Sequence, residues 1–165
     1  MPTQQQDYIV RHIQTISRLV ARLRLKGKML SEEDRAEVND ALLLALQLQE
    51  KNFGRPAAEF LNLTADEQFA ALCRAESKAA GHERCLTYVT LLRETAELYA
   101  CRGSSDLALG ARQLALFIAL RVGLDHPADA PAVRSTVENL LRLLDGAELH
   151  PPTRDLLAGF ARLAR

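Results

Sequence analysis

The sequence predicts an all-α fold of six to seven helices arranged as antiparallel hairpins. Apolar residues recur every three to four positions in almost every window of the 165 residues, which is the period of an amphipathic helix. Runs of alternating β-branched residues, the pattern of half-buried strands, are absent from the sequence. The eight glycines and six prolines are few and fall mostly between the periodic segments, where they end one helix and precede the next.

Length and composition indicate one globular domain over residues 1–165. Hydrophobic residues make up 48% and charged residues 25%, so the chain can bury a core without disulfides or a structural metal. Basic and acidic side chains number 21 each, so no global field attracts nucleic acid or anionic lipid. Without an uninterrupted run of 18 apolar residues or a signal-like start, we expect a cytoplasmic protein that does not contact a membrane.

The first predicted helix, residues 4–26, has the strongest amphipathic pattern in the chain. Thr3 can cap it, and its apolar stripe follows spacings of four, three, four and three residues before Gly27. The stripe consists of Ile9, Ile13, Ile16, Val20 and Leu23. We expect this stripe to pack into the core or against a second copy of the chain, which makes a homodimer an expectation as well.

The polar face of this helix is basic. Residues 1–30 hold six basic side chains and one acid, Asp7. The basic face consists of Arg11, Arg18, Arg22 and Arg24. Such a face suggests an alternative function, a nucleic-acid-associated regulatory module that contacts phosphates. Nucleic acid is nevertheless not the favoured partner, because the chain has no helix-turn-helix signature with a basic recognition helix.

Two capping boxes mark the starts of later helices. Ser31 with Asp34 begins a helix that should end near Asn52, before Gly54, with a short helical turn following as far as Phe60.

The second box, Thr64 with Glu67, begins a helix that is predicted to run to about Ala80 and to stop at Gly81.

Residues 83–122 are the most informative segment. Two long helical patterns, 83–102 and 105–122, are joined by only Gly103 and Ser104, which forces an antiparallel hairpin. We expect this helix pair to be the central element of the fold. Two shorter helices are predicted after it, one from about Ala130 to Gly146 and one from about Pro152 to the end of the chain.

Leu91–Pro127 resembles one helix pair of the tetratricopeptide-repeat family. In that family a small residue, an aromatic, a turn glycine and another small residue follow one another at set spacings. The matching residues here are Ala96, Tyr99, Gly103 and Ala108, with Ala115 at a later small position. The chain departs from the pattern at Arg112, where an aromatic is usual, and at Pro127, which falls about seven residues late. The resemblance implies stacked helical hairpins and, by analogy, a protein-binding surface.

The start of the chain carries a second resemblance. DYIVRHIQTISRLVARL, residues 7–23, resembles the first helix of small uncharacterised bacterial proteins that place tetratricopeptide-like hairpins behind such a helix. This resemblance implies a fold and no assigned activity.

The cysteines and histidines do not form a recognisable catalytic or metal-binding pattern. His82 and Cys85 form an H-x-x-C pair with Cys73 upstream, but a zinc site wants four ligands in close pairs. A Cys85 nucleophile activated by His82 would need an oxyanion hole, and no motif for one is present. We therefore expect reduced structural thiols at all three cysteines, Cys101 included, with no cofactor, no metal and no enzymatic activity.

The function that we favour is a non-enzymatic scaffold, adaptor or chaperone-like module that holds a protein or peptide in the groove of its helical hairpins. Charged and aromatic side chains on the central pair are the candidates for lining that groove. They are Arg93, Glu97, Tyr99 and Arg112.

Overall fold

Eight α-helices and one 3-10 turn make up most of the residues that the structure describes, and those residues contain no strand. The structure is a computed structural model that describes residues 4–27, 29–75 and 77–163. The helices are α1 (Gln4–Lys26), α2 (Glu32–Phe53), α3 (Ala57–Phe60), α4 (Ala65–Cys73), α5 (Lys78–Cys101), α6 (Ser105–Asp125), α7 (Ala130–Leu143) and α8 (Pro151–Arg162), with the turn η1 (Pro127–Asp129) before α7. The predicted all-α class is confirmed, and the short α3 brings the number of helices to eight.

Capping side chains begin α2 and α4 at the predicted residues. The Ser31 hydroxyl accepts a hydrogen bond from the Asp34 amide at 3.1 Å, and the Asp34 carboxylate accepts one from the Ser31 amide at 3.2 Å. Thr64 and Glu67 make the same reciprocal pair at 3.2 and 2.7 Å. At the other end of α2, Gly54 has a φ of +69°, the left-handed conformation that glycine adopts without strain.

The prediction that α4 runs to Ala80 and stops at Gly81 is wrong. α4 ends at Cys73, and Ser77 caps a new helix, α5, by accepting a hydrogen bond from the Ala80 amide at 3.1 Å. Gly81 lies inside α5, where a Cβ would stand 3.0 Å from the Cα of Cys73. This glycine therefore allows α5 to pass close to the end of α4, which a single sequence cannot distinguish from a helix stop.

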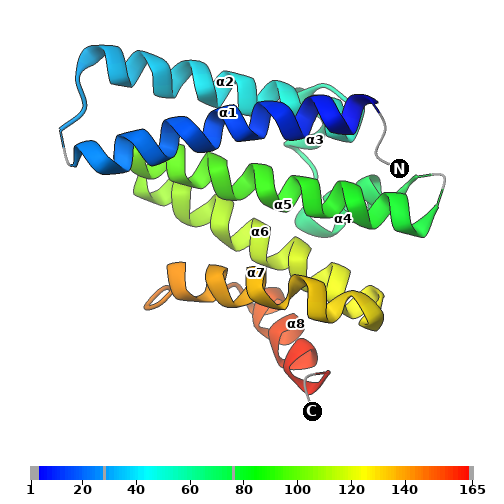
Figure 1. The fold of residues 1–165 in the computed structure, drawn as a ribbon. Coiled ribbons are helices and arrows are strands. Elements are labelled where there is room, and N and C mark those ends of the chain that lie inside the picture. The colour runs from blue at the N-terminus through cyan, green and yellow to red at the C-terminus, as the bar shows by residue number, and fades with distance from the viewer. Residues whose placement is uncertain (1–3, 28, 76, 164–165) are drawn as a thin grey trace.

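α5 and α6 form an antiparallel hairpin in the middle of the molecule (Figure 1). The turn between them passes through Gly103, whose φ is +83°, and the Ser104 amide donates to the carbonyl of Tyr99 at 2.9 Å. Four alanines in the pair are 1% exposed or less, namely Ala96, Ala108, Ala115 and Ala119. Small buried residues of this kind let two helix backbones approach closely.

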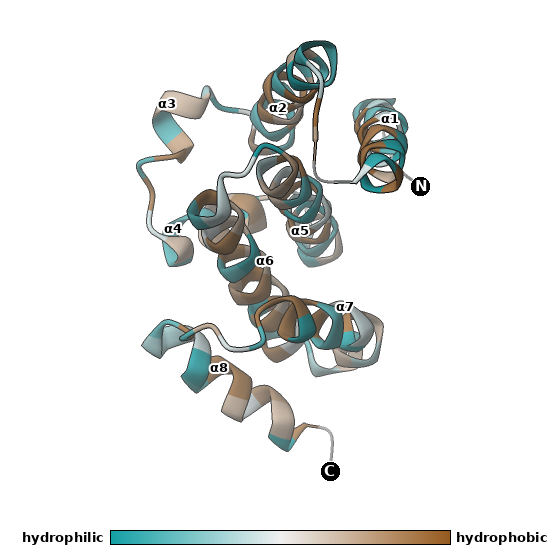
Figure 2. Cartoon of the chain, turned by 90° about the vertical axis from the view of Figure 1, so that its left-hand side faces the viewer, coloured by the Kyte–Doolittle hydropathy of each residue, from teal (hydrophilic) through white to brown (hydrophobic). Residues whose placement is uncertain are grey.

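α6 is the most apolar helix and lies at the centre of the molecule, with α4, α5, α7 and α8 packed around it (Figure 2). By length and composition alone it could cross a membrane, and it is the one such helix in the part of the chain described. Buried residues make up 56% of its most apolar 18-residue window. Its packing inside the bundle accounts for this apolar composition, since a helix buried on most sides is hydrophobic around most of its circumference.

α1 packs its whole apolar stripe against α2 and α5. All five residues of the stripe are 8% exposed or less, and they form a cluster with one face of α2, including Val38 and Leu48. The predicted Thr3 cap lies outside the described residues. Because the stripe is buried within the chain, it is not available as a surface for a second copy.

α8 crosses α6 at Gly123. A Cβ at this position would stand 2.6 Å from Cε2 of Phe160 and 3.1 Å from Cγ2 of Val133. We expect Gly123→Ala to lower the free energy of unfolding by about 1–3 kcal/mol, because overpacking forces buried neighbours to shift. Urea unfolding measures the change, and Gly123→Ala combined with Phe160→Leu should recover part of it.

Candidate functional site

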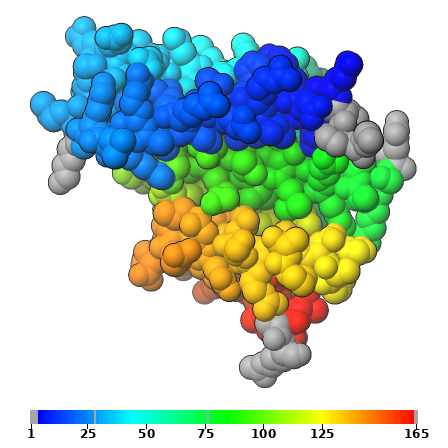
Figure 3. Space-filling model, in the orientation of Figure 1, coloured from blue at the N-terminus to red at the C-terminus, as the bar shows by residue number. Residues whose placement is uncertain are grey.

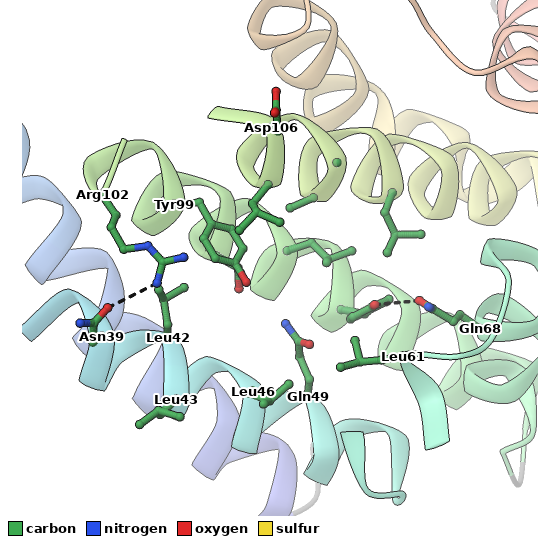
Figure 4. A pocket seen from close by; sticks show the side chains of 17 residues that line it. Asn39, Leu42, Leu43, Leu46, Gln49, Leu61, Gln68, Tyr99, Arg102 and Asp106 are labelled. Carbon is green, nitrogen blue, oxygen red and sulfur yellow. Dashed lines mark hydrogen bonds between the residues drawn. The ribbon is translucent and has the colours of Figure 1, made fainter. Parts of the chain in front are cut away.

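An open groove with a volume of about 730 Å³ lies between α2 and α6, above α5. We call it the apolar groove. It is lined by Asn39, Leu42, Leu43, Leu46 and Gln49 of α2, by Leu61 and Gln68 near α3 and α4, by Tyr88, Leu92, Thr95, Tyr99 and Arg102 along and just after α5, and by Asp106, Leu107, Gly110, Ala111 and Leu114 of α6. Figure 4 shows Tyr99, Gln49 and Leu61 around one space, with Asp106 at the edge and pointing away from it.

Each helix contributes one stripe of residues to the groove, at helical spacing. On α5 the stripe runs from Tyr88 to Tyr99 and continues to Arg102, a length of about 21 Å at 1.5 Å per residue. α2 already buries one apolar face against α1, so the leucines of the groove form a second face of the same helix. The sequence signal for this second face is the run Leu42–Leu46, which is apolar throughout.

Three large apolar side chains at the rim of the groove are exposed. Leu43 is 62% exposed, Leu61 57% and Leu107 51%. They come from α2, from the residue after α3 and from α6, so they surround the groove on separate elements. Clustered exposed leucines around a concave surface are typical of a binding site for an apolar partner surface.

Two polar groups inside the groove have no hydrogen-bond partner among the residues described. Gln49 is only 4% exposed, and its carboxamide points into the groove (Figure 4). The hydroxyl of Tyr99 lies in the same space. By contrast, the Tyr88 hydroxyl donates to Oε1 of Gln68 at 2.7 Å, and burial raises the pKa of Tyr88. The floor therefore combines a satisfied polar pair with two groups that are free for a ligand.

The charges that line the groove are Arg102 and Asp106, at the end beside the α5–α6 turn. The Arg102 guanidinium lies 5.2 Å from the centre of the Tyr99 ring and donates to Oδ1 of Asn39 at 3.4 Å. At the opposite end, Gln68 donates to the carbonyl of Leu63 at 3.2 Å, which ties α4 to the preceding turn. The groove is thus charged at one end and apolar along most of its length.

The four residues predicted to line a groove do not all lie together. Tyr99 is in the apolar groove, whereas Arg93 and Glu97 project from another side of α5 into a separate cleft of about 410 Å³ near α1 and α7. In this charged cleft Glu97 pairs with Arg24, and Arg112 from α6 reaches the same carboxylate at 3.3 Å. The hydrogen bond with Glu97 raises the pKa of Arg24.

Arg93 completes the charged cleft by donating to Oδ1 of Asn139 on α7 at 2.9 Å. In Figure 3 the surface of α5 is visible between α1 and α7 on this side of the molecule.

The basic face of α1 is partly neutralised. Arg22 pairs with Glu37 of α2, and Arg24 pairs with Glu97 of α5. Arg11 and Arg18 are exposed and have no acidic partner among the described residues. Two unpaired arginines on one helix are a small footprint for phosphate binding.

The cysteine and histidine pair singled out in the sequence has a structural arrangement. Cys85 is fully buried with its Sγ 3.8 Å from that of Cys73, and burial raises the pKa of both thiols. A nucleophilic cysteine needs the opposite shift, toward the thiolate. In the described part of the chain, no group of three or more His, Cys, Asp or Glu side chains is placed to hold a metal ion.

His82 binds two carboxylates instead of the thiol. Its Nε2 lies 2.9 Å from Oδ2 of Asp125, and its Nδ1 lies 3.1 Å from Oδ2 of Asp129. These bonds fasten α5 to the end of α6 and to η1.

We expect His82→Ala to lower the free energy of unfolding at neutral pH by about 1–2 kcal/mol, because it removes hydrogen bonds to two partly exposed carboxylates. The hydrogen bond from His82 lowers the pKa of Asp125. Stability that depends on a lowered carboxyl pKa is present above the ordinary value and is lost as the pH falls through the lowered one.

The difference between wild type and His82→Ala should therefore shrink in acid. Urea unfolding at pH 7 and at about pH 3 checks this, because the second value lies below the ordinary pKa of aspartate. An equal difference at both pH values would contradict the assignment.

Comparison of the chain with protein-family models, with curated proteins and with solved structures finds no match.

Proposed function

We propose that this protein is a non-enzymatic cytoplasmic scaffold that binds an amphipathic helix of a partner protein in the apolar groove. The observation that carries the proposal is the ring of exposed leucines, Leu43, Leu61 and Leu107, around a groove of about 730 Å³. A floor of about 21 Å matches roughly four turns of a bound helix. Helix in groove is the favoured mode because the described residues offer no strand edge for an extended peptide.

Charge complementarity indicates which helix fits. Residues 32–73, which form α2, α3 and α4 on one side of the groove, carry nine acidic and three basic side chains. None of these acids lines the groove itself, and three are paired with bases outside this stretch: Asp34 with Lys26, Glu37 with Arg22 and Asp66 with Arg121. The excess that remains favours a partner helix whose polar face is basic, because opposite charges around an interface speed association.

The tetratricopeptide-like relationship is part of the same proposal. The buried small residues of α5 and α6 support it, since they occupy the positions where that family brings paired helices together. Tyr99 matches the family pattern in spacing, but its side chain lines the open groove. Arg112, which stands where the family usually has an aromatic, pairs with Glu97.

Binding of a displayed library of amphipathic peptides, each about 18 residues long, tests the proposal. Peptides selected on the wild-type protein are labelled, and their Kd values are measured by fluorescence anisotropy. We expect Leu43→Glu and Leu107→Glu each to weaken binding at least about 10-fold, because each places a charge against the apolar stripe of the peptide.

Leu109→Glu is the matched control. Leu109 is also an exposed leucine of α6, at 36%, and lies outside the apolar groove. Its substitution should leave the Kd within about 2-fold. The proposal fails if no helical peptide is selected, or if the selected peptides bind the groove variants as well as they bind the control.

A nucleic-acid function would give a different result. Arg11→Glu combined with Arg18→Glu would then abolish binding of a labelled single-stranded oligonucleotide, and wild-type binding would fall steeply as salt rises. We expect no such binding at physiological salt, given that Arg22 and Arg24 are paired.

The predicted homodimer remains a proposal that light scattering tests directly. Since the stripe of α1 is buried within one chain, a dimer would have to use another surface.

A further inference from the structure

Gly110 stands in the interior of α6, where glycine weakens a helix because it loses more conformational freedom on folding than other residues do. A Cβ added at this position would meet no atom within 4 Å. Gly81 and Gly123, in contrast, have neighbours at 3.0 and 2.6 Å from an added Cβ, so the fold itself needs those two glycines. The packing of the chain does not require Gly110.

The place of Gly110 in the groove accounts for a glycine that the packing of the chain does not require. It lies on the α6 wall of the apolar groove, beside Ala111 and one turn from Leu107 and Leu114. Because glycine has no side chain and alanine only a methyl group, the α6 wall projects least into the groove at Gly110 and Ala111. Helices that cross at small residues bring their backbones into close contact, so the gap at Gly110 fits a helix crossing α6.

Gln49 supplies an independent observation on the opposite wall. Its side chain is 4% exposed, yet its carboxamide has no hydrogen-bond partner among the described residues. Neither polar atom of Gln49 is among the buried side-chain atoms left without a partner in the described part of the chain, because the open groove leaves the carboxamide accessible. A helix that covers the groove removes that access, so it has to supply a hydrogen bond in return. In Figure 4 this carboxamide points into the groove, on the side where the Tyr99 hydroxyl lies.

The chemistry of the missing partner follows from the geometry. The backbone amides and carbonyls in the middle of a bound helix are already paired within that helix, so only a side chain can reach Gln49. A carboxamide offers both a donor and an acceptor to another carboxamide. A charged group would lose its hydration in this apolar space, which makes asparagine or glutamine the fitting residue.

We propose that the occupant of the apolar groove is a basic amphipathic helix that crosses α6 at Gly110 through a small residue and presents one asparagine or glutamine to Gln49. This proposal rests on the function proposed above and specifies the sequence of the partner. The apolar stripe of such a helix contains large aliphatic residues for the rim leucines, interrupted by one glycine, alanine or serine and by one carboxamide residue.

Gly110→Ala separates stability from binding. Because alanine favours the helix and meets no neighbour, the variant should melt about 1–3 °C higher than wild type. Its affinity for the peptides selected on wild type should fall at least about 10-fold, because the new methyl group keeps the bound helix away from α6. Gly159→Ala in α8 is the control, since an added Cβ meets only Leu124 at an ordinary 3.5 Å. It should leave affinity unchanged.

A double-mutant cycle tests the carboxamide pair. Gln49→Leu is combined with replacement of the asparagine or glutamine of the selected peptide by leucine, and all four Kd values are measured. We expect each single change to weaken binding about 10-fold, and the double change to recover most of the loss, since two apolar groups then face each other.

The outcomes distinguish this inference from the proposed function. If a peptide binds and depends on Leu107, but neither Gly110→Ala nor Gln49→Leu alters its affinity, the groove binds helices and the specific inference is wrong. Absence of small and carboxamide residues from the stripes of the selected peptides would also overturn it. If no helical peptide binds at all, both proposals fail.

Discussion

Phe60→Ala is expected to lower the free energy of unfolding by about 3–5 kcal/mol, the range for removing a buried phenylalanine side chain. Phe60 is fully buried and stacks on Phe53, with ring centres 4.4 Å apart and planes 5° from parallel. Phe53 in turn meets the ring of Tyr88 edge-on at 4.9 Å. The four residues of α3 are too few to form a stable helix alone, so this aromatic cluster holds α3 in place.

Urea unfolding followed by circular dichroism measures the effect of Phe60→Ala. The control is Leu61→Ala at the next residue, where 57% exposure predicts a change within about 0.5 kcal/mol. Since Leu61 and Gln68 close one end of the groove, Phe60→Ala should also weaken peptide binding at a temperature where the variant is still folded. A loss of less than about 1 kcal/mol would show that the cavity collapses or that α3 is not held by this side chain.

Ile16→Ala is expected to cost about 2–5 kcal/mol, as for other buried aliphatic side chains cut back to alanine. Ile16 is 1% exposed in the middle of the α1 stripe, within the cluster that includes Val38 and Leu48 of α2 and Leu91 of α5. The cost has two parts, the transfer of apolar surface to water and the cavity that remains.

Val10→Ala on the same helix is the control for Ile16→Ala. Val10 is 47% exposed, so its replacement should change the free energy of unfolding by no more than about 0.5 kcal/mol. Amide hydrogen exchange adds a second measurement, because loosening of α1 should reduce protection in α1 before α6. Equal effects of the two variants would mean that the stripe of α1 is not buried in solution.

The elements that could be predicted from the sequence depend on local interactions. The capping boxes at Ser31 and Thr64 involve residues three positions apart, and the turn at Gly103 depends on one residue with a positive φ. The stripe of α1 repeats at helical spacing without interruption. In each case the physical cause lies within a few residues, so the amino-acid order contains it.

Gly81 is an example of a residue whose role cannot be predicted from its local sequence. Glycine in a helical pattern can mark a stop, a close approach or an open surface, and the chain contains all three: Gly54 ends α2, Gly81 passes against Cys73, and Gly110 faces open space. The difference lies in which atoms stand nearby, and those atoms come from distant parts of the sequence.

The candidate site could likewise be predicted only in part, because its residues come together through the packing of separate helices. Tyr99 was predicted to line a groove together with Arg93 and Glu97, all from one helix. The neighbours of α5 separate them, because α2 and α6 border the side that carries Tyr99, whereas α1 and α7 border the side that carries Arg93 and Glu97. Gln49 and Leu107 carry no signal of their own until α2 and α6 face each other across the groove.

The helical class, the ends of several helices and the central hairpin therefore follow from the amino-acid order, because periodicity, capping and turn conformation act over short distances. Which face of each helix is buried depends on the packing of the whole chain, since burial is set by the helices that surround it. The exposed leucines, the unpaired carboxamide of Gln49 and the open space at Gly110 become a single groove through that packing alone.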